Sequence, residues 1–574
     1  MHTVETVLLV LMLGALTGIA ARYVRAIPLP LIQIALGALI AWPQDGLHIA
    51  YAPELGLLLF IPPLLFADGW RIPKREFFAL AKPILLLAFG LVFITVFGLG
   101  YLIHWLIPSI PLTVAFALAA VVSPTDAVAV SAISRNLGMP SKTMHLLEGE
   151  SLLNDASGLV ALKFAVAATL TAGSFSWENA AKDFTWMSVG GLGLGALMGW
   201  GFSRGRDMVT RRVGDVAATQ MVLLLILLPF ASYIMGEYIG VSGILSAVAA
   251  GIATNFADLD RSNFISERLQ TEGTWSMVEA AFNGAIFLLL GLQLPSIIGE
   301  TLRGAAHRDV WLLLGYVAAI SCALLALRWA WLMLGVRSSL HKAHRQGRMV
   351  ERPSALLTLA TTVAGIRGAV TLAAALSIPT HLANGRVFPE RNLLIFLATG
   401  TILFTLVLGS IVLPLLLRRI PPVEDTQAQH EERLARTAAC QAAIASLALP
   451  EDQAQQHSAQ WLAQHQEVAG RITQEYRNRI QLLDESGVAN TPEAQSDSPE
   501  VVHERRLRYL REIELRLHCI QVERNTLYAE RQAHRINDEM LRSMVSELDM
   551  SEVSLRKRLA VARRAVGLPP LEGH

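Results

Sequence analysis

The sequence predicts an all-α polytopic membrane protein with about 13 transmembrane helices, inverted repeats and a helical cytoplasmic C-terminal domain. Three observations predict this fold class. Hydrophobic residues make up 53% of the 574 residues and charged residues only 17%, whereas ordinary soluble domains are about 25% charged. Apolar stretches that approach the length of a bilayer helix recur up to residue 420. Two of them, near 112–134 and 356–378, contain helix-breaking residues, as expected of paired broken, crossing helices.

Thirteen apolar stretches approach the roughly 20 residues that a helix needs to cross a bilayer. They run near 5–23, 28–42, 54–69, 80–106, 112–134, 143–172, 184–203, 216–238, 241–255, 275–298, 310–335, 356–378 and 392–417. When loops are assigned alternately to the two sides, one side has 21 Lys and Arg residues and the other has 5. The positive-inside rule places the richer side in the cytoplasm. The N-terminus is therefore expected outside and the C-terminus in the cytoplasm.

The composition changes after Pro421 and Pro422 to Gln, Glu, Arg and Ala, which divides the chain into a membrane domain, 1–420, and a cytoplasmic helical tail, 421–574. A polar stretch from 484 to 499 should be flexible. Beyond it, apolar residues recur at spacings of three and four, which predicts a helix that packs along a partner helix: Leu510, Ile513, Leu517 and Ile520. The tail is expected either to have a structural or dimerising role or to regulate the rest of the protein. A net charge of +1 points to no nucleic-acid partner, and the three cysteines are too far apart for a metal site or a disulfide framework.

Two spans are expected to be broken within the membrane. Residues 121–128 read VVSPTDAV. Pro124 lacks an amide hydrogen and clashes with the carbonyl group one turn back, so the backbone groups around it should be free to bind an ion. Residues 361–371 read TTVAGIRGAVT, where Gly365 and Gly368 flank Arg367 and allow the helix to unwind. Because Arg367 stays protonated, it must meet either a carboxylate or the carbonyl groups at a helix end.

The span 143–172 contains a row of polar side chains, with EGESLLNDASG at residues 148–158. Ser151 and Asp155 are four residues apart and share one helix face, while Glu150 and Asn154 form an adjacent pair. An ionisable group at the bilayer centre costs at least about 2.5–3.5 kcal/mol, so each one requires a partner, water or a function. A hard alkali cation requires oxygen ligands. The pattern therefore predicts a cation site on this helix.

Three motifs, SPTDAVAV, GESLLNDASG and GIRGAVTLAAAL, together resemble the NhaP-type sodium/proton antiporters of bacteria and archaea and the sodium/proton exchangers of animals. The resemblance covers roughly residues 5–420. It implies a homodimer in the plasma membrane, the inner membrane of a bacterium, that serves pH homeostasis. The pair Asn154–Asp155 implies electroneutral exchange of one sodium ion, with lithium as a further substrate, for one proton.

The resemblance implies a role in ion binding for several residues. Asp155 would bind the cation and the proton in turn. Ser151, Asp126 and the backbone carbonyl group of Thr125 would complete the cation shell. Asp68, in the span 54–69, would reach the site through water. No cofactor is implied, since sodium ions and protons are the transported substrates.

Other residues are implied to support the site. Asn154 would hold the broken helix in place, and Glu150 would pair with Arg367. Asp126 could also cap the second half of its broken helix, because aspartate accepts hydrogen bonds from free amide groups at a helix start. Both roles are compatible.

Three further charged residues in the spans have an ordinary explanation. Lys163, Arg328 and Glu279 are expected to reach solvent by extending their side chains towards a membrane surface. Asn283, four residues beyond Glu279, would share its polar face.

The sequence leads to a hypothesis of competition at Asp155, which would be protonated when the cation is absent and ionised when it is bound. Exchange of this kind is not enzymatic, and it would require one helix bundle to move against the other. Potassium/proton exchange is the nearest alternative, because cavity size and ligand flexibility decide selectivity. An ion channel would present rings or filter loops, which are not apparent. An intramembrane aspartyl protease could use Asp126 and Asp155 as a dyad, but the adjacent hydroxyl and amide groups suit cation binding better.

Overall fold

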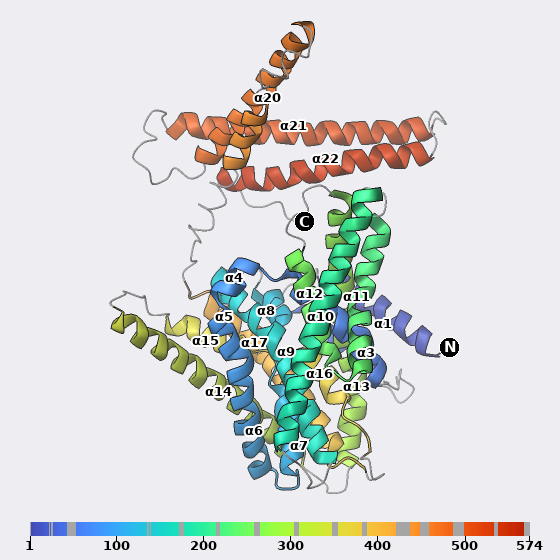
Figure 1. The fold of residues 1–574 in the computed structure, drawn as a ribbon, viewed down its shortest axis with the longest axis vertical. Helices are drawn as coiled ribbons and strands as arrows, with labels where there is room; N and C mark the ends of the chain where they lie inside the picture. Colours follow the sequence, from blue (N-terminus) through green and yellow to red (C-terminus); the bar gives the residue numbers. More distant parts are fainter. Residues whose placement is uncertain are drawn as a thin grey trace. The chain divides into compact units, whose positions relative to one another are not determined.

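A computed structural model describes residues 2–21, 23, 27–42, 53–134, 137, 139–170, 177–213, 218–257, 265–303, 309–346, 354–381, 387–420, 437–447, 459–485, 499–532 and 538–566. The chain forms two compact units, Met1–Val423 and Glu424–His574, and each is considered by itself. In the described residues the regular elements are helices, apart from an isolated β-bridge between His381 and Val387. The fold is therefore all-α, as predicted (Figure 1).

The first part of unit 1 contains nine α-helices and one π-helical turn, η1. They are α1 (His2–Ala20), α2 (Leu29–Ala41), α3 (Pro53–Arg71), α4 (Lys74–Ala79), α5 (Ala81–Leu85), η1 (Leu86–Leu91), α6 (Val92–Leu106), α7 (Leu112–Val122), α8 (Ala127–Ser134) and α9 (Ser141–Leu170). The rest of the unit contains α10 (Trp177–Val213), α11 (Ala218–Ile239), α12 (Gly243–Ala257), α13 (Ile265–Arg303), α14 (Val310–Arg345), α15 (Ala355–Val363), α16 (Ala369–Leu376) and α17 (Arg391–Leu417).

Each of the thirteen predicted spans coincides with a helix or a pair of half-helices in the described residues. Seven described helices are long and apolar enough to cross a membrane: Ala81–Leu106, Leu112–Ser134, Ser141–Leu170, Thr219–Ile239, Gln270–Thr301, Val310–His341 and Arg391–Leu417. Three more are apolar but shorter, Leu8–Ala20, Leu29–Ala41 and Gly243–Ala257. The protein is thus embedded in a membrane, and the number of thirteen crossings and their orientation stay predictions.

Both helices that were predicted to break do so. The helix of residues 112–134 is interrupted between α7 and α8, at the segment that contains Pro124, and the helix of residues 355–376 is interrupted between α15 and α16. The two interruptions meet, because the amide of Asp126 donates a hydrogen bond to the carbonyl oxygen of Ile366 at 2.8 Å. This contact satisfies backbone groups that the breaks remove from their helices, as a membrane interior requires.

The helices of unit 1 form two groups by their packing. One group joins α2 with α13, α10 with α12, and α12 with α3; the other joins α7 with α6 and α9, and α17 with α14 and α15. Close packing in the first group depends on glycine. A Cβ atom on Gly291 would overlap the carbonyl oxygen of Ile34, and one on Gly37 would overlap that of Leu288, so small residues let these two backbones touch.

Unit 2 contains α20 (Ala459–Glu485), α21 (Pro499–Gln532) and α22 (Asp538–Ala565). Residues 486–498 of the polar stretch predicted to be flexible lie outside the described residues. The apolar face predicted on α21 packs against α22 of the same chain, through buried Leu510, Ile513, Leu559 and Ala562. Arg524 of α21 also pairs with Asp549 at 2.6 Å and with Glu552. The partner helix of α21 is therefore within this unit.

Candidate functional site

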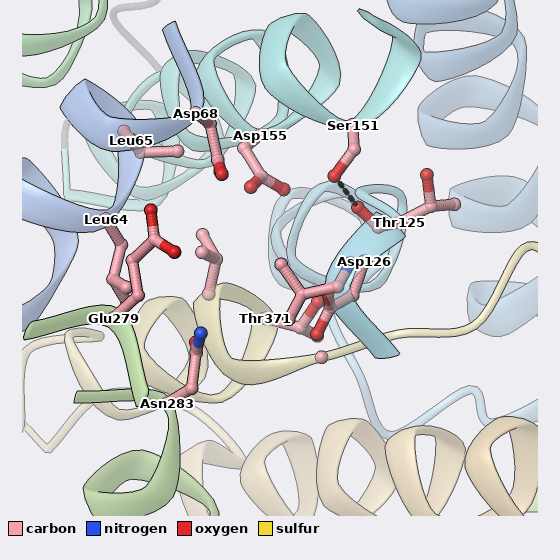
Figure 2. A pocket seen from close by; sticks show the side chains of 13 residues that line it. Leu64, Leu65, Asp68, Thr125, Asp126, Ser151, Asp155, Glu279, Asn283 and Thr371 are labelled. Carbon is pink, nitrogen blue, oxygen red and sulfur yellow. Dashed lines mark hydrogen bonds between the residues drawn. The ribbon is translucent and has the colours of Figure 1, made fainter. Parts of the chain in front are cut away.

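The residues proposed from sequence to bind the ion gather around one small cavity in unit 1 (Figure 2). Asp155 is on α9 and is 6% exposed. The cavity has a volume of about 40 Å³, and since one water molecule needs about 10–15 Å³ by the same measure, it has room for an ion with few waters. Its polar lining residues are Asp68, Thr125, Asp126, Ser151, Asp155, Glu279, Asn283 and Thr371.

Hydrogen bonds from α9 hold the break between α7 and α8 in a fixed shape. The hydroxyl group of Ser151 donates to the carbonyl oxygen of Thr125 at 2.8 Å and accepts from the amide of Ala127 at 3.2 Å. The side-chain amide of Asn154 donates to the hydroxyl oxygen of Thr125 at 2.8 Å. Ser151 and Asn154 therefore fix the Thr125 carbonyl group beside the cavity.

Asp126 caps α8. Its Oδ1 atom accepts hydrogen bonds from the amides of Val128 at 2.8 Å and Ala129 at 3.0 Å. These amides belong to the first turn of α8, where the backbone N–H groups have no carbonyl partner within the helix. A Cβ atom built on Gly368 would overlap Oδ2 of Asp126. Gly368 thus leaves the space that the carboxylate occupies between the two broken helices, and the capping role does not remove Asp126 from the cavity.

Glu150 pairs with Arg328 of α14, so the expected pair of Glu150 with Arg367 is wrong. One guanidinium nitrogen of Arg328 donates to Glu150 Oε2 at 2.8 Å, the other contacts Oε1, and Nε donates to the carbonyl oxygen of Thr361 at 3.2 Å. Both side chains of the pair are 1% exposed. The expectation that Arg328 reaches solvent is wrong too, because its planar fork matches the carboxylate in a buried bidentate pair.

Arg367 meets the carbonyl groups that the broken helices leave free. Its Nε donates to the carbonyl oxygen of Val122 at 2.9 Å, and Nη1 donates to that of Gly365. The side chain is buried, with 3% of the residue exposed. Sequence reasoning had kept a carboxylate and helix-end carbonyl groups as the two alternatives, and the carbonyl groups are the observed partners. Arg367 therefore links the ends of α7 and α15.

Asp68 of α3 lines the cavity, and its implied link to the site through water stays a prediction. Figure 2 shows the carboxylates of Asp68 and Asp155 directed into the same space, with Glu279 on the side of Asp68. Glu279 and Asn283 of α13 also line the cavity. Glu279 was expected to reach solvent, but its side chain is only 19% exposed and pairs with Arg71. The four-residue spacing of these two polar residues in an apolar span was the signal that could have identified them.

Four carboxylates line this cavity: those of Asp68, Asp126, Asp155 and Glu279. Among the described residues, Asp155 forms no ion pair, whereas Glu279 pairs with Arg71. Several ionised carboxylates in a small buried space repel one another, so protons or cations must offset part of the charge. The arrangement can hold an alkali cation through hydroxyl, carbonyl and carboxylate oxygens, and it can hold a proton in its place.

Two other features lie away from this cavity. Lys163, two turns beyond Asp155, is partly exposed and pairs with Glu237 of α11 at 2.8 Å, so it has a partner as well as access to solvent. A second cavity of about 520 Å³ lies among α13, α14 and α17 and is lined by apolar side chains apart from Thr399. Its lining includes no carboxylate, so of these two cavities among the described residues the first has the ligands of a cation site.

Comparison with known proteins gives the same assignment at the level of the family. Residues 8–419 match the family model for the transmembrane domain of sodium/hydrogen exchangers. The chain is 41% identical over 556 residues to an uncharacterised Na⁺/H⁺ exchanger of Escherichia coli K12, covering 96% of this chain and 98% of that protein. It is 46% identical over 433 residues to a sodium, potassium, lithium and rubidium/H⁺ antiporter of Bacillus pumilus, covering 74% of this chain and 64% of that protein.

A solved structure has the same fold. The sodium proton antiporter MjNhaP1 of Methanocaldococcus jannaschii superposes with a TM-score of 0.57 at 17% sequence identity, over 73% of this chain and 99% of that protein. At this identity the likeness concerns the fold of the membrane unit. The family match over residues 8–419 and the 41% identity to the Escherichia coli relative show that the chain belongs to the sodium/hydrogen exchanger family.

Proposed function

We propose that this protein exchanges sodium ions for protons across the plasma membrane, with both ions competing for Asp155. The main support is the position of this carboxylate, which lines a cavity beside the fixed Thr125 carbonyl group and the Ser151 hydroxyl group. When Asp155 is ionised, these oxygens and Asp126 bind the cation. When Asp155 takes up a proton, its charge is lost and the cation leaves. Transport then follows from alternation of these two states, without enzyme chemistry.

The exchange is electroneutral in this proposal. Asn154 is the neighbour of Asp155 on α9, and its side-chain amide is used in a hydrogen bond to Thr125. An amide does not titrate at physiological pH, so α9 provides one ionisable group at the cavity and one proton is exchanged for each monovalent cation. A second carboxylate in place of Asn154 would allow a second proton and would make the exchange electrogenic.

The movement that gives access to each side is assigned to the group α5–α9 and α14–α17, which moves against α1–α3 and α10–α13. The packing within each of the two groups supports this division, and paired broken helices are a feature of inverted-repeat transporters. We place the N-terminus outside and unit 2 in the cytoplasm, because Lys and Arg are concentrated on one side of the predicted spans. We also propose a homodimer that serves pH homeostasis, with unit 2 having a dimerising or a regulatory role.

Potassium is the second candidate substrate. The relative from Bacillus pumilus is described as a sodium, potassium, lithium and rubidium/H⁺ antiporter, and it is 46% identical over the matched region. A broad choice of alkali cation requires a site whose oxygen ligands can adapt to ions of different radius. Lithium and potassium therefore belong in the same assay as sodium.

The deciding experiment uses liposomes that contain the purified wild type or Asp155→Asn. A proton gradient is imposed, and its collapse is measured after addition of sodium, lithium or potassium, with the membrane voltage either clamped or free. We expect sodium to collapse the gradient in the wild type at either voltage setting and to have no effect with Asp155→Asn. Collapse by potassium alone would change the substrate; normal transport by Asp155→Asn would refute the site. Cation flux without a proton gradient or proton movement would indicate a channel.

A further inference from the structure

Glu279 occupies a position at the cavity that the exchange mechanism above does not use. It comes from α13, which belongs to the helix group that packs with α2, whereas Asp155, Ser151 and Asp126 belong to the other group. The cavity is therefore lined by both groups, and Glu279 and Asp68 form the wall that the first group contributes, with Glu279 on the side of Asp68 in Figure 2.

The two carboxylate oxygens of Glu279 have different surroundings. Oε2 accepts from Arg71, whose other terminal nitrogen is 3.2 Å from the hydroxyl oxygen of Ser276. Oε1 is buried and has no hydrogen-bond partner among the described residues. A buried carboxylate oxygen without a partner is costly, by roughly 1–3 kcal/mol or more for a charged group. Arg71 thus orients the carboxylate, and the second oxygen remains to bind what enters the cavity.

Arg71 contacts one oxygen of Glu279 and leaves the other without a hydrogen-bond partner among the described residues. The side chain of Arg71 is 38% exposed, and a pair with an exposed partner is screened by water and contributes little. Asp68 contributes a second carboxylate on the same wall. The wall therefore supplies carboxylate oxygens from α3 and α13, which suit an alkali cation that keeps part of its water shell.

We infer that Glu279 is a cation-binding residue on the side of the cavity that α3 and α13 form. Together with Asp68, it receives the partly hydrated alkali cation and passes it to Asp155. Arg71 is the positioning residue that directs one oxygen of Glu279 into the cavity. In this arrangement Glu279 determines the apparent affinity for the cation, whereas Asp155 determines the maximal rate of exchange. This inference rests on the proposed cation/proton exchange.

The test measures the KM for sodium and the maximal rate in proteoliposomes with the wild type, Glu279→Gln and Glu279→Asp. Glutamine keeps the shape but removes the charge, so we expect the KM to rise about tenfold, which corresponds to about 1.4 kcal/mol, while the maximal rate stays within about twofold of the wild type. Aspartate keeps the charge on a shorter side chain and should raise the KM less than glutamine does. A retained maximal rate also shows that the variants fold.

Glu272→Gln is the matched control, because Glu272 is an exposed carboxylate on the same helix two turns earlier. It should leave both the KM and the maximal rate unchanged. An unchanged KM in Glu279→Gln, or a loss of its maximal rate at saturating sodium, would overturn the role of Glu279 and leave the exchange function intact. Absence of sodium-dependent proton flux in the wild type would instead refute the exchange function on which this inference rests.

Discussion

The buried pair of Glu150 and Arg328 gives the sharpest test of how the site is supported. Arg328 donates to both oxygens of Glu150 and to the carbonyl oxygen of Thr361, so it joins α14, α9 and α15. Arg328→Gln would leave an ionised carboxylate without its counter-charge in a position that is 0% exposed. Breaking a buried pair in this way costs about 3–5 kcal/mol, which is a large part of the stability of a typical protein.

The double variant separates the pair from the individual side chains. When Glu150→Gln is combined with Arg328→Gln, no buried charge remains uncompensated, and the loss of stability should be about 2–3 kcal/mol smaller than the sum of the two single losses. Glu150→Gln combined with Arg367→Gln should be close to additive, because Arg367 donates to backbone carbonyl groups. The comparison thus distinguishes the observed pair from the pair expected from sequence.

The measurement is the free energy of unfolding in mixed detergent micelles, followed by circular dichroism. Arg337→Gln is the control, since Arg337 is exposed on the same helix, α14, and its replacement should change the stability by less than about 0.5 kcal/mol. If Arg328→Gln were no less stable than this control, or if coupling appeared with Arg367 and not with Arg328, the account of the buried pair would be wrong.

Two further predictions concern the cavity and the tail. Ser151→Ala removes the hydrogen bonds that fix the Thr125 carbonyl group, so the KM for sodium should rise by about five- to tenfold, from about 1 kcal/mol per hydrogen bond; a wild-type KM in the same liposome assay would contradict this. In the tail, the hydrogen bond from Arg524 lowers the pKa of Glu552, so the pair stabilises α22 above the ordinary pKa of a glutamate and this contribution is lost as the pH falls through the lowered value. Glu552→Gln should therefore speed amide exchange of α22 in the full chain at pH 7 and have no effect once the pH is below that value; equal exchange at pH 7 would refute it.

Much of the membrane fold could be predicted because the bilayer allows few alternatives. Every backbone N–H and C=O group inside the bilayer must form a hydrogen bond within the protein, and a helix achieves this by itself. Apolar runs of the right length therefore identify helices directly. The two helix breaks could also be predicted, because Pro124 and the glycines around Arg367 destabilise the interior of a helix and are expected where the helix is interrupted. The position of Asp155 beside Ser151 followed from helical periodicity alone.

Pairing between distant helices could not be read in this way. Glu150 and Arg328 are separated by 178 positions, and their contact depends on how α9 and α14 are rotated against each other. Glu279 shows the same limit, because the rotation of α13 decides whether Glu279 and Asn283 face lipid, solvent or the cavity. Local sequence determines the helices, whereas their mutual rotation determines which charges meet.

Two of the buried arginines, Arg328 and Arg367, explain how the Asp155 carboxylate can persist without an arginine partner. Arg328 donates hydrogen bonds to Glu150, and Arg367 donates to the carbonyl oxygens of Val122 and Gly365. Each is held by several hydrogen bonds, so neither is free to turn towards Asp155. A permanent arginine partner would keep Asp155 ionised without a bound cation and would make the proton unnecessary. Because both arginines are engaged elsewhere, the proposed exchange leaves a transported cation or a proton to balance the charge of Asp155, and in that proposal this requirement couples the two fluxes.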